Sequence, residues 1–227
     1  MLAQFVLFDG FDPLDVIAPF EALSAASEYV DGVDVQLVSA EGARDVPSGI
    51  VGVSLSAAAT IDPSRADVIV LPGAVGLMPR EDMTDEEERR SIPAILGRTL
   101  ETDLPRLMSE ALARDGLTVA TVCGGSLILA MAGLIEGRNA TTHHAGMDAL
   151  DATGAVAIDA RVVDDGDLIT AAGVTSGLEL GLYLLEREVG PRIAHSVERL
   201  FAHERRGVVW RDHGPVPAGV GAVSSPS

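Results

Sequence analysis

Cys123 is the single cysteine of this 227-residue chain, and its neighbours suit a reactive thiol. It directly follows an apolar run typical of a buried strand, and Gly124 and Gly125 separate it from an apolar helical pattern. A sharp strand-to-helix turn at the carboxyl end of a sheet exposes a nucleophile where ligands bind. The start of the helix should also lower the pKa of the thiol. The alternative is a buried structural cysteine, the commoner role of a lone Cys.

Alternating strand and helix patterns surround this turn. Apolar runs predict strands over 2–8, 33–40, 66–74, 117–123 and 138–144, a hairpin within 42–60, and two strands within 157–173 that are joined by Asp-Asp-Gly. Helical spacing covers 14–30, 107–116, 125–135, 147–154 and 176–190. Such alternation predicts an α/β fold with a mostly parallel sheet covered on both faces. We expect one domain over 1–212 and a disordered tail over 213–227, which is rich in Pro, Gly, Ala and Ser.

Residues 79–106 differ from the rest of the chain, because they are charged, are interrupted by prolines and contain no strand pattern. We expect an exposed, partly helical excursion. It serves either as a lid or dimer contact, or simply as a solvated surface loop.

The charge of the chain limits its partners. Asp and Glu number 34 against 16 basic residues, all of them Arg, for a formal net charge of −18. Such a chain is a poor partner for nucleic acid. The excess of acid indicates either a well-hydrated surface or adaptation to high salt. No signal peptide or long apolar stretch is present, which predicts a cytoplasmic protein without a membrane partner.

Cofactor motifs are absent from the sequence. The histidines lack the recurring spacing of a metal site, and one cysteine makes no cluster. Neither a Gly-x-Gly-x-x-Gly segment after a strand nor a P-loop occurs. We therefore expect no metal and no cofactor.

Three stretches of the chain resemble the ThiJ/PfpI superfamily, and within it the isonitrile hydratase branch and the amidase-like sensor domains of some regulators. They are LFDGFDPLDVIAPFEAL, VIVLPGAVG, and TVCGGSLILAMAGLIEGRNATTHH continuing through GDLITAAGVTSGLELGLYLLE. Together they span most of the chain from Gln4 to about Glu188. The resemblance implies a flavodoxin-like three-layer sandwich with a cysteine nucleophile elbow, commonly a homodimer.

The resemblance also implies site residues. The acid that partners the cysteine corresponds to Asp15, where a carboxyl group near the thiol can take or give a proton; the alternative is a helix cap before Val16. Three backbone N–H groups are placed to meet a developing anion, and one histidine is placed for an architectural rather than catalytic role near the site. These residues are Gly73, Ala74 and Gly124 for the N–H groups, and His143 for the histidine.

Two features depart from the pattern of the hydratases. Gly124 stands where they carry a threonine whose hydroxyl is part of the site, so a water would have to replace that hydroxyl. Protease-like members carry a histidine there, so Gly124 also argues against a Cys-His pair within the elbow. The excursion over 79–106 is longer than the usual connection.

The resemblance to the isonitrile hydratase branch implies a cofactor-independent enzyme that adds water to an isocyanide and yields an N-substituted formamide. Cys123 attacks the terminal carbon, Asp15 protonates the developing imidoyl centre, and water hydrolyses the thioimidate. One alternative is glyoxalase-like hydration of a small dicarbonyl, which the lack of a histidine beside the cysteine disfavours. The other is a non-catalytic small-molecule or redox sensor.

Overall fold

The computed structural model describes residues 1–215, and its centre is an eight-stranded sheet. The strands of this sheet are β1 (Leu2–Leu7), β2 (Asp34–Ser39), β5 (Ala59–Thr60), β6 (Val68–Leu71), β7 (Thr118–Val122), β10 (Val162–Asp165), β11 (Leu168–Ala171) and β12 (Trp210–Arg211). Their order is β12-β10-β11-β7-β6-β1-β2-β5. Neighbours from β11 to β5 pair in parallel, whereas β10 runs antiparallel to β11. The mostly parallel sheet is therefore confirmed.

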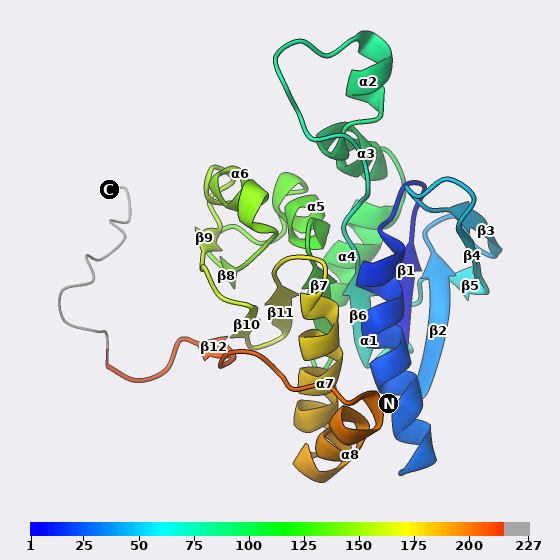
Figure 1. Cartoon of the computed structure of the whole chain (residues 1–227), viewed down its shortest axis with the longest axis vertical. Helices are drawn as coiled ribbons and strands as arrows, with labels where there is room; N and C mark the ends of the chain where they lie inside the picture. Colours follow the sequence, from blue (N-terminus) through cyan, green and yellow to red (C-terminus); the bar gives the residue numbers. More distant parts are fainter. Residues whose placement is uncertain (216–227) are drawn as a thin grey trace.

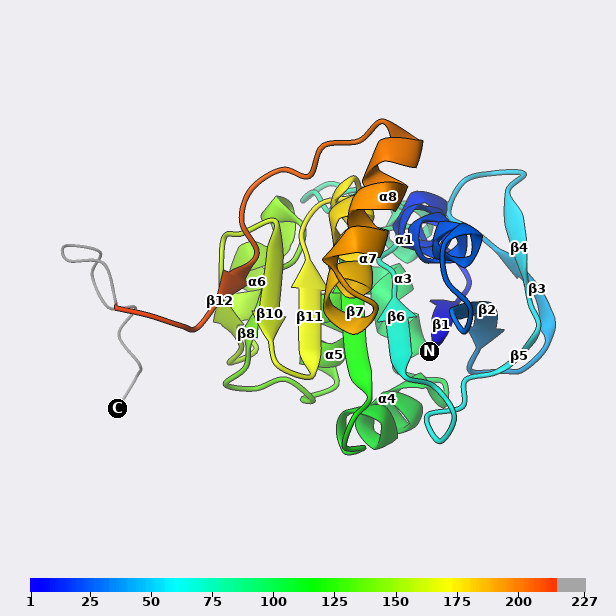
Figure 2. The ribbon, with the colours of Figure 1, turned by 90° about the horizontal axis from the view of Figure 1, so that it is seen from below.

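Helices cover both faces of this sheet (Figure 2). They are α1 (Pro13–Ala25), α2 (Asp85–Arg89), α3 (Ile92–Thr99), α4 (Leu104–Leu112), α5 (Gly125–Met131), α6 (Met147–Asp151), α7 (Ser176–Glu188) and α8 (Pro191–Phe201). Helices α1, α7 and α8 lie on one face, and α4 and α5 lie on the other. The central strands β6 and β7 are buried along their whole length, as their unbroken apolar runs require. The predicted three-layer sandwich is confirmed.

Close packing of α1 against α7 fixes the position of the first turn of α1, which carries Asp15. Gly181 of α7 faces Ala22 and Pro19 of α1, and a Cβ on Gly181 would lie only 2.8 Å from the Ala22 Cβ. A larger residue at this position would push the two helices apart. The backbone of Asp15 lies beside Gly177, one turn earlier along α7.

The structure changes several predicted boundaries. The predicted hairpin within 42–60 is confirmed as β3 (Arg44–Pro47) and β4 (Ser54–Ala57). The strand predicted over 138–144 is wrong beyond β8 (Asn139–Ala140), which pairs with β9 (Val156–Ala157). After β8 the chain bonds to side-chain and turn groups instead of to a strand backbone, because the Thr141 N–H is donated to the Thr170 side-chain Oγ1 and the Thr142 hydroxyl to the Cys123 carbonyl.

The excursion over 79–106 contains α2, α3 and the start of α4 (Figure 1). Helix α2 projects at one end of the molecule, while α3 lies beneath it, closer to the sheet. Ile95 and Leu96 of α3 are buried, so the excursion is not a solvated loop throughout. Its outer part is exposed, as predicted.

Two further predictions concern the chain as a whole. Among residues 1–215, no helix is both long enough and apolar enough to cross a membrane. The disordered tail predicted over 213–227 falls, from residue 216 onward, outside the described residues.

Candidate active site

The ends of three neighbouring strands bring the predicted site residues together. Strands β1, β6 and β7 are adjacent and parallel, so the loops after them meet at one edge of the sheet. Gly73 and Cys123 lie in two of these loops, and Asp15 lies in the first turn of α1, directly after the third. A Cβ on Gly73 would lie 2.6 Å from the Gly124 nitrogen and 3.0 Å from Asp15 Oδ2. Glycine at position 73 therefore lets the three loops approach one another.

Cys123 occupies a strained turn between β7 and α5. Its φ angle is +55°, a left-handed conformation that costs a residue with a Cβ about 1–2 kcal/mol. Bonds on both sides hold it there, because its N–H is donated to the carbonyls of Ala171 and Ala172, and its own carbonyl accepts the Thr142 hydroxyl at 2.8 Å. The predicted nucleophile elbow is confirmed. Its side chain is nevertheless largely covered, since the residue is only 8% exposed.

Asp15 lies fully buried beside this thiol. Its Oδ2 accepts the Gly73 N–H at 2.9 Å, and the carboxyl group is near enough to the Cys123 thiol for the pKa of each group to depend on the other. Its Oδ1 has no hydrogen-bond partner within residues 1–215. The alternative role as a helix cap is wrong, because Asp12 caps α1 by accepting the Leu14 N–H at 2.9 Å.

Burial determines the protonation of this pair. Desolvation, with a smaller contribution from the charge of Asp12, raises the pKa of Asp15 to about 8. Desolvation and the neighbouring Asp15 carboxylate also raise the pKa of the Cys123 thiol. The N–H of Gly124 at the helix start does lower the thiol pKa, as predicted, but burial has the larger effect, so the predicted net lowering is wrong. At neutral pH the resting site holds a carboxylic acid and a thiol.

The three predicted backbone donors differ in availability. The Gly73 N–H is already donated to Asp15, so its predicted role as a free donor to an anion does not hold in this structure. The Gly124 N–H faces the Cys123 sulfur and favours its thiolate form. The Ala74 N–H is donated to no acceptor within the part of the chain that is described, because its neighbours Gly73 and Val75 make the backbone bonds to the 10–12 segment.

His143 makes the contacts of an architectural residue. Its Nδ1 accepts the Ala145 N–H at 3.2 Å and caps the short 3-10 turn His144–Gly146. Its ring lies against that of His144, with centroids 4.1 Å apart. Burial and the neighbouring His144 lower the pKa of His143, which keeps its imidazole neutral. The ring also lies beside Gly173, two residues after the strand next to β7.

Sequence reasoning missed three residues of this site. Thr142 supports the elbow through the Cys123 carbonyl, and the paired threonines before His143 were the available signal. Asp12 raises the pKa of Asp15, and an Asp-Pro pair at a helix start is a recognisable cap. Leu96 had no local signal, because it reaches the elbow from α3.

Leu96 occupies the space beside Gly124. A Cβ at position 124 would lie 3.2 Å from Leu96 Cδ1, which is tighter than ordinary van der Waals contact. The backbone of Gly124 is itself helical, with φ −69°, so its conformation does not require glycine. A side chain at position 124 would therefore press against Leu96, which packs against the elbow from α3.

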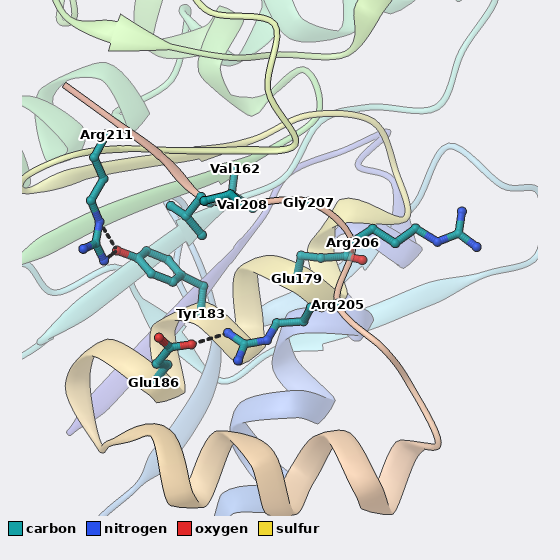
Figure 3. Close-up of a pocket in the computed structure, with 10 residues that line it drawn as sticks. Val162, Glu179, Tyr183, Glu186, Arg205, Arg206, Gly207, Val208 and Arg211 are labelled. Carbon is teal, nitrogen blue, oxygen red and sulfur yellow. Dashed lines mark hydrogen bonds and ion pairs between the residues drawn. The ribbon is translucent and has the colours of Figure 1, made fainter. Parts of the chain in front are cut away.

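A separate cavity of about 370 Å³ lies between α7 and the segment 205–211 (Figure 3). Two of its arginines are paired within the lining, because Arg205 binds Glu186 and Arg211 binds the Tyr183 hydroxyl. Neither Cys123 nor Asp15 lines this cavity. The groups that can do chemistry are at the elbow instead.

Comparisons with a family model, with known protein sequences and with solved structures all relate this chain to the same group of proteins. Residues 99–187 match the model of the DJ-1/PfpI family. The chain is 33% identical to isonitrile hydratase from Pseudomonas putida, over 86% of this chain and 75% of that protein. It is 27% identical to the HTH-type transcriptional regulator CdhR from Pseudomonas aeruginosa, over 87% of this chain but only 53% of the regulator.

A solved structure agrees with these matches. A THiJ/PfpI family protein from Pseudomonas syringae superposes with a TM-score of 0.71 and 27% identity, covering 91% of this chain and 76% of that one. The elbow cysteine, the buried acid beside it and these likenesses have one common explanation. The chain belongs to the DJ-1/PfpI family.

Proposed function

We propose that this protein hydrates an isocyanide to an N-substituted formamide, with Cys123 as nucleophile and Asp15 as the proton-transfer group. The observation that carries the proposal is the geometry of the elbow, where Cys123 in its left-handed turn meets the fully buried Asp15 carboxyl group. Burial raises the pKa of Asp15 to about 8 and also raises the pKa of the thiol, which favours the neutral form of both groups. The likeness to an isonitrile hydratase over three quarters of that enzyme's length supports the same reaction.

The first step suits an acid and a thiol that are both protonated. The terminal carbon of an isocyanide carries a lone pair, so it takes the proton of the Asp15 carboxyl and forms a C–H bond. The Cys123 sulfur then bonds to that electrophilic carbon, and the S–H proton passes to the Asp15 carboxylate. The product is a thioimidate, and Asp15 is again protonated.

Hydrolysis in the second step uses the same carboxyl group. Asp15 protonates the imidoyl nitrogen while water adds to the carbon, and its carboxylate takes a proton from that water. The C–S bond then breaks, the carbonyl of the formamide forms, and the remaining proton returns to sulfur. One water is consumed and both side chains return to their starting state.

A direct test measures formamide produced from a simple alkyl isocyanide. We expect turnover by the wild type and a loss of at least about 100-fold in both Cys123→Ala and Asp15→Asn, since each removes a group that bonds to or protonates the substrate. Asp148→Asn is the matched control, because Asp148 is an exposed acid on α6. It should retain wild-type turnover.

The contrary outcome is equally clear. A folded wild type that forms no formamide from any of several alkyl and aryl isocyanides would overturn the hydratase proposal. Turnover of methylglyoxal by the same preparation would then favour dicarbonyl chemistry at the same cysteine.

A further inference from the structure

A cavity of about 330 Å³ opens beside α3, and three arginines gather at it. Arg89 and Arg90 come from the end of α2 and the turn after it, and Arg98 comes from α3. Val75, Gly76 and Gly49 form much of the opposing wall. A cavity of this volume is large enough for a small organic ligand.

None of these guanidinium groups pairs with a carboxylate among residues 1–215, although acids outnumber arginines by 34 to 16 in the chain. Arg98 Nη1 instead donates to the Arg89 carbonyl at 2.8 Å, which leaves its other donors free. The nearest block of acid, residues 81–88, is partly neutralised by Arg80, which pairs with Asp82 and Glu87. Carboxylate partners are plentiful on this surface, yet none is placed in the cavity.

The backbone holds the cavity in a defined shape. The Leu77 N–H is donated to the Arg90 carbonyl at 2.9 Å, and the Ile92 N–H to the Leu77 carbonyl at 3.0 Å. Gly76 packs so closely that a Cβ would lie 2.6 Å from the Arg90 carbonyl oxygen, and one on Gly49 would lie 2.2 Å from that of Val75. Glycine is therefore required at both positions. These backbone contacts fix the position of the chain from which the Arg90 side chain extends.

We propose that this cavity binds a small oxyanion, carried as a carboxylate or a phosphate group. Guanidinium groups match both groups geometrically by donating two parallel hydrogen bonds. The net charge of −18 does not prevent this, because charges beyond about 8 Å are largely screened at physiological salt and none of the acids of residues 81–88 lines the cavity. The inference goes beyond the proposed hydration, since neither Cys123 nor Asp15 takes part.

The test is titration of the ¹⁵N-labelled full chain with inorganic phosphate and, separately, with succinate, in a low-chloride buffer. Saturable shifts are expected for the amides of Gly49, Gly76 and Leu77, whose signals report on the cavity wall. A response to phosphate alone, to succinate alone or to both supports the site and identifies the group that it takes.

The matched variants separate this site from general charge effects. Arg90→Gln combined with Arg98→Gln should weaken binding by about tenfold or more, because it removes charge-assisted hydrogen bonds. Arg192→Gln changes an exposed arginine on α8, far along the chain from the cavity, and should leave binding unchanged. No saturable shift with either anion, or equal weakening in both variants, would overturn the proposal. Dispersed spectra of the variants will show that they are folded. Their formamide turnover is measured separately, so that the result for this cavity is independent of the result for the proposed hydration.

Discussion

Asp15 and Cys123 share a buried environment in which neither side chain is charged at neutral pH. This differs from the thiolate that the elbow motif alone suggests. A carboxyl group that stays protonated to about pH 8 can act as an acid at physiological pH, and the proposed reaction begins with a proton transfer to carbon.

The pH dependence of turnover follows from the same pKa. Because the first step requires protonated Asp15, kcat/KM for an isocyanide should be level near pH 6–7 and fall about tenfold per unit well above pH 8. Steady-state rates across this range in a constant-ionic-strength buffer will test it. A rate that rises through pH 8 and 9 would show that the thiolate, and not the acid, is the limiting species.

Asp15 should also make stability depend on pH. Its carboxyl group titrates near 3.8 when unfolded and near 8 when folded, so between these values the folded state holds the extra proton. The free energy of unfolding should therefore fall as pH rises through this window, by at most about 1.4 kcal/mol per unit, and level off above it. Asp15→Asn should remove this slope and gain stability relative to the wild type as pH increases. Urea unfolding at pH 5, 6.5 and 8 measures it, with Asp148→Asn expected to follow the wild type.

Helix α3 determines what position 124 can hold. Gly124→Thr should destabilise the fold by about 1–3 kcal/mol, because the new side chain overpacks against Leu96. Adding Leu96→Ala should recover part of that loss, so the effects of the two changes should not be additive. Urea denaturation of both single variants and the double variant forms the necessary cycle. Additive effects would mean that Leu96 does not obstruct the position.

Elements built from local patterns were predictable from the sequence, and those built from distant contacts were not. The β7 run followed by two glycines identified the elbow, and the acidic segment 81–88 identified exposed chain. The protonation of the pair depends on burial in the folded chain and on Asp12, which lies far from Cys123 in the sequence. The failed strand prediction at 141–144 has a similar cause, because Thr141 and Thr142 bond to the distant residues Thr170 and Cys123 instead of to a neighbouring strand backbone.

At the scale of the molecule, the excess of acid should make stability depend on salt. The net charge of −18 implies repulsion among carboxylates that exceeds the gain from the exposed arginine pairs, which are each worth at most about 1 kcal/mol. Raising NaCl from 0.1 to 1 M shortens the screening length from about 10 to 3 Å, so Tm should rise by several degrees. Thermal unfolding followed by circular dichroism measures this change. A lower Tm at 1 M NaCl would show that the ion pairs outweigh the repulsion.

The homodimer expected from the family resemblance is a further prediction at this scale. Sedimentation equilibrium at micromolar concentration should give twice the mass of the chain. A single-chain mass at all concentrations would contradict it. The Arg90→Gln, Arg98→Gln double variant run alongside will show whether the cavity beside α3 contributes to association.

Both edges of the central sheet end in strands of two residues, β12 on one side and β5 on the other. A long unpaired strand is a template on which another chain can add its own strand, and very short edges deny that template. At high concentration this protein should therefore resist the strand-by-strand growth that leads to amyloid. Within residues 1–215, a second copy that reached either edge would find an outer strand of only two residues on which to extend the sheet.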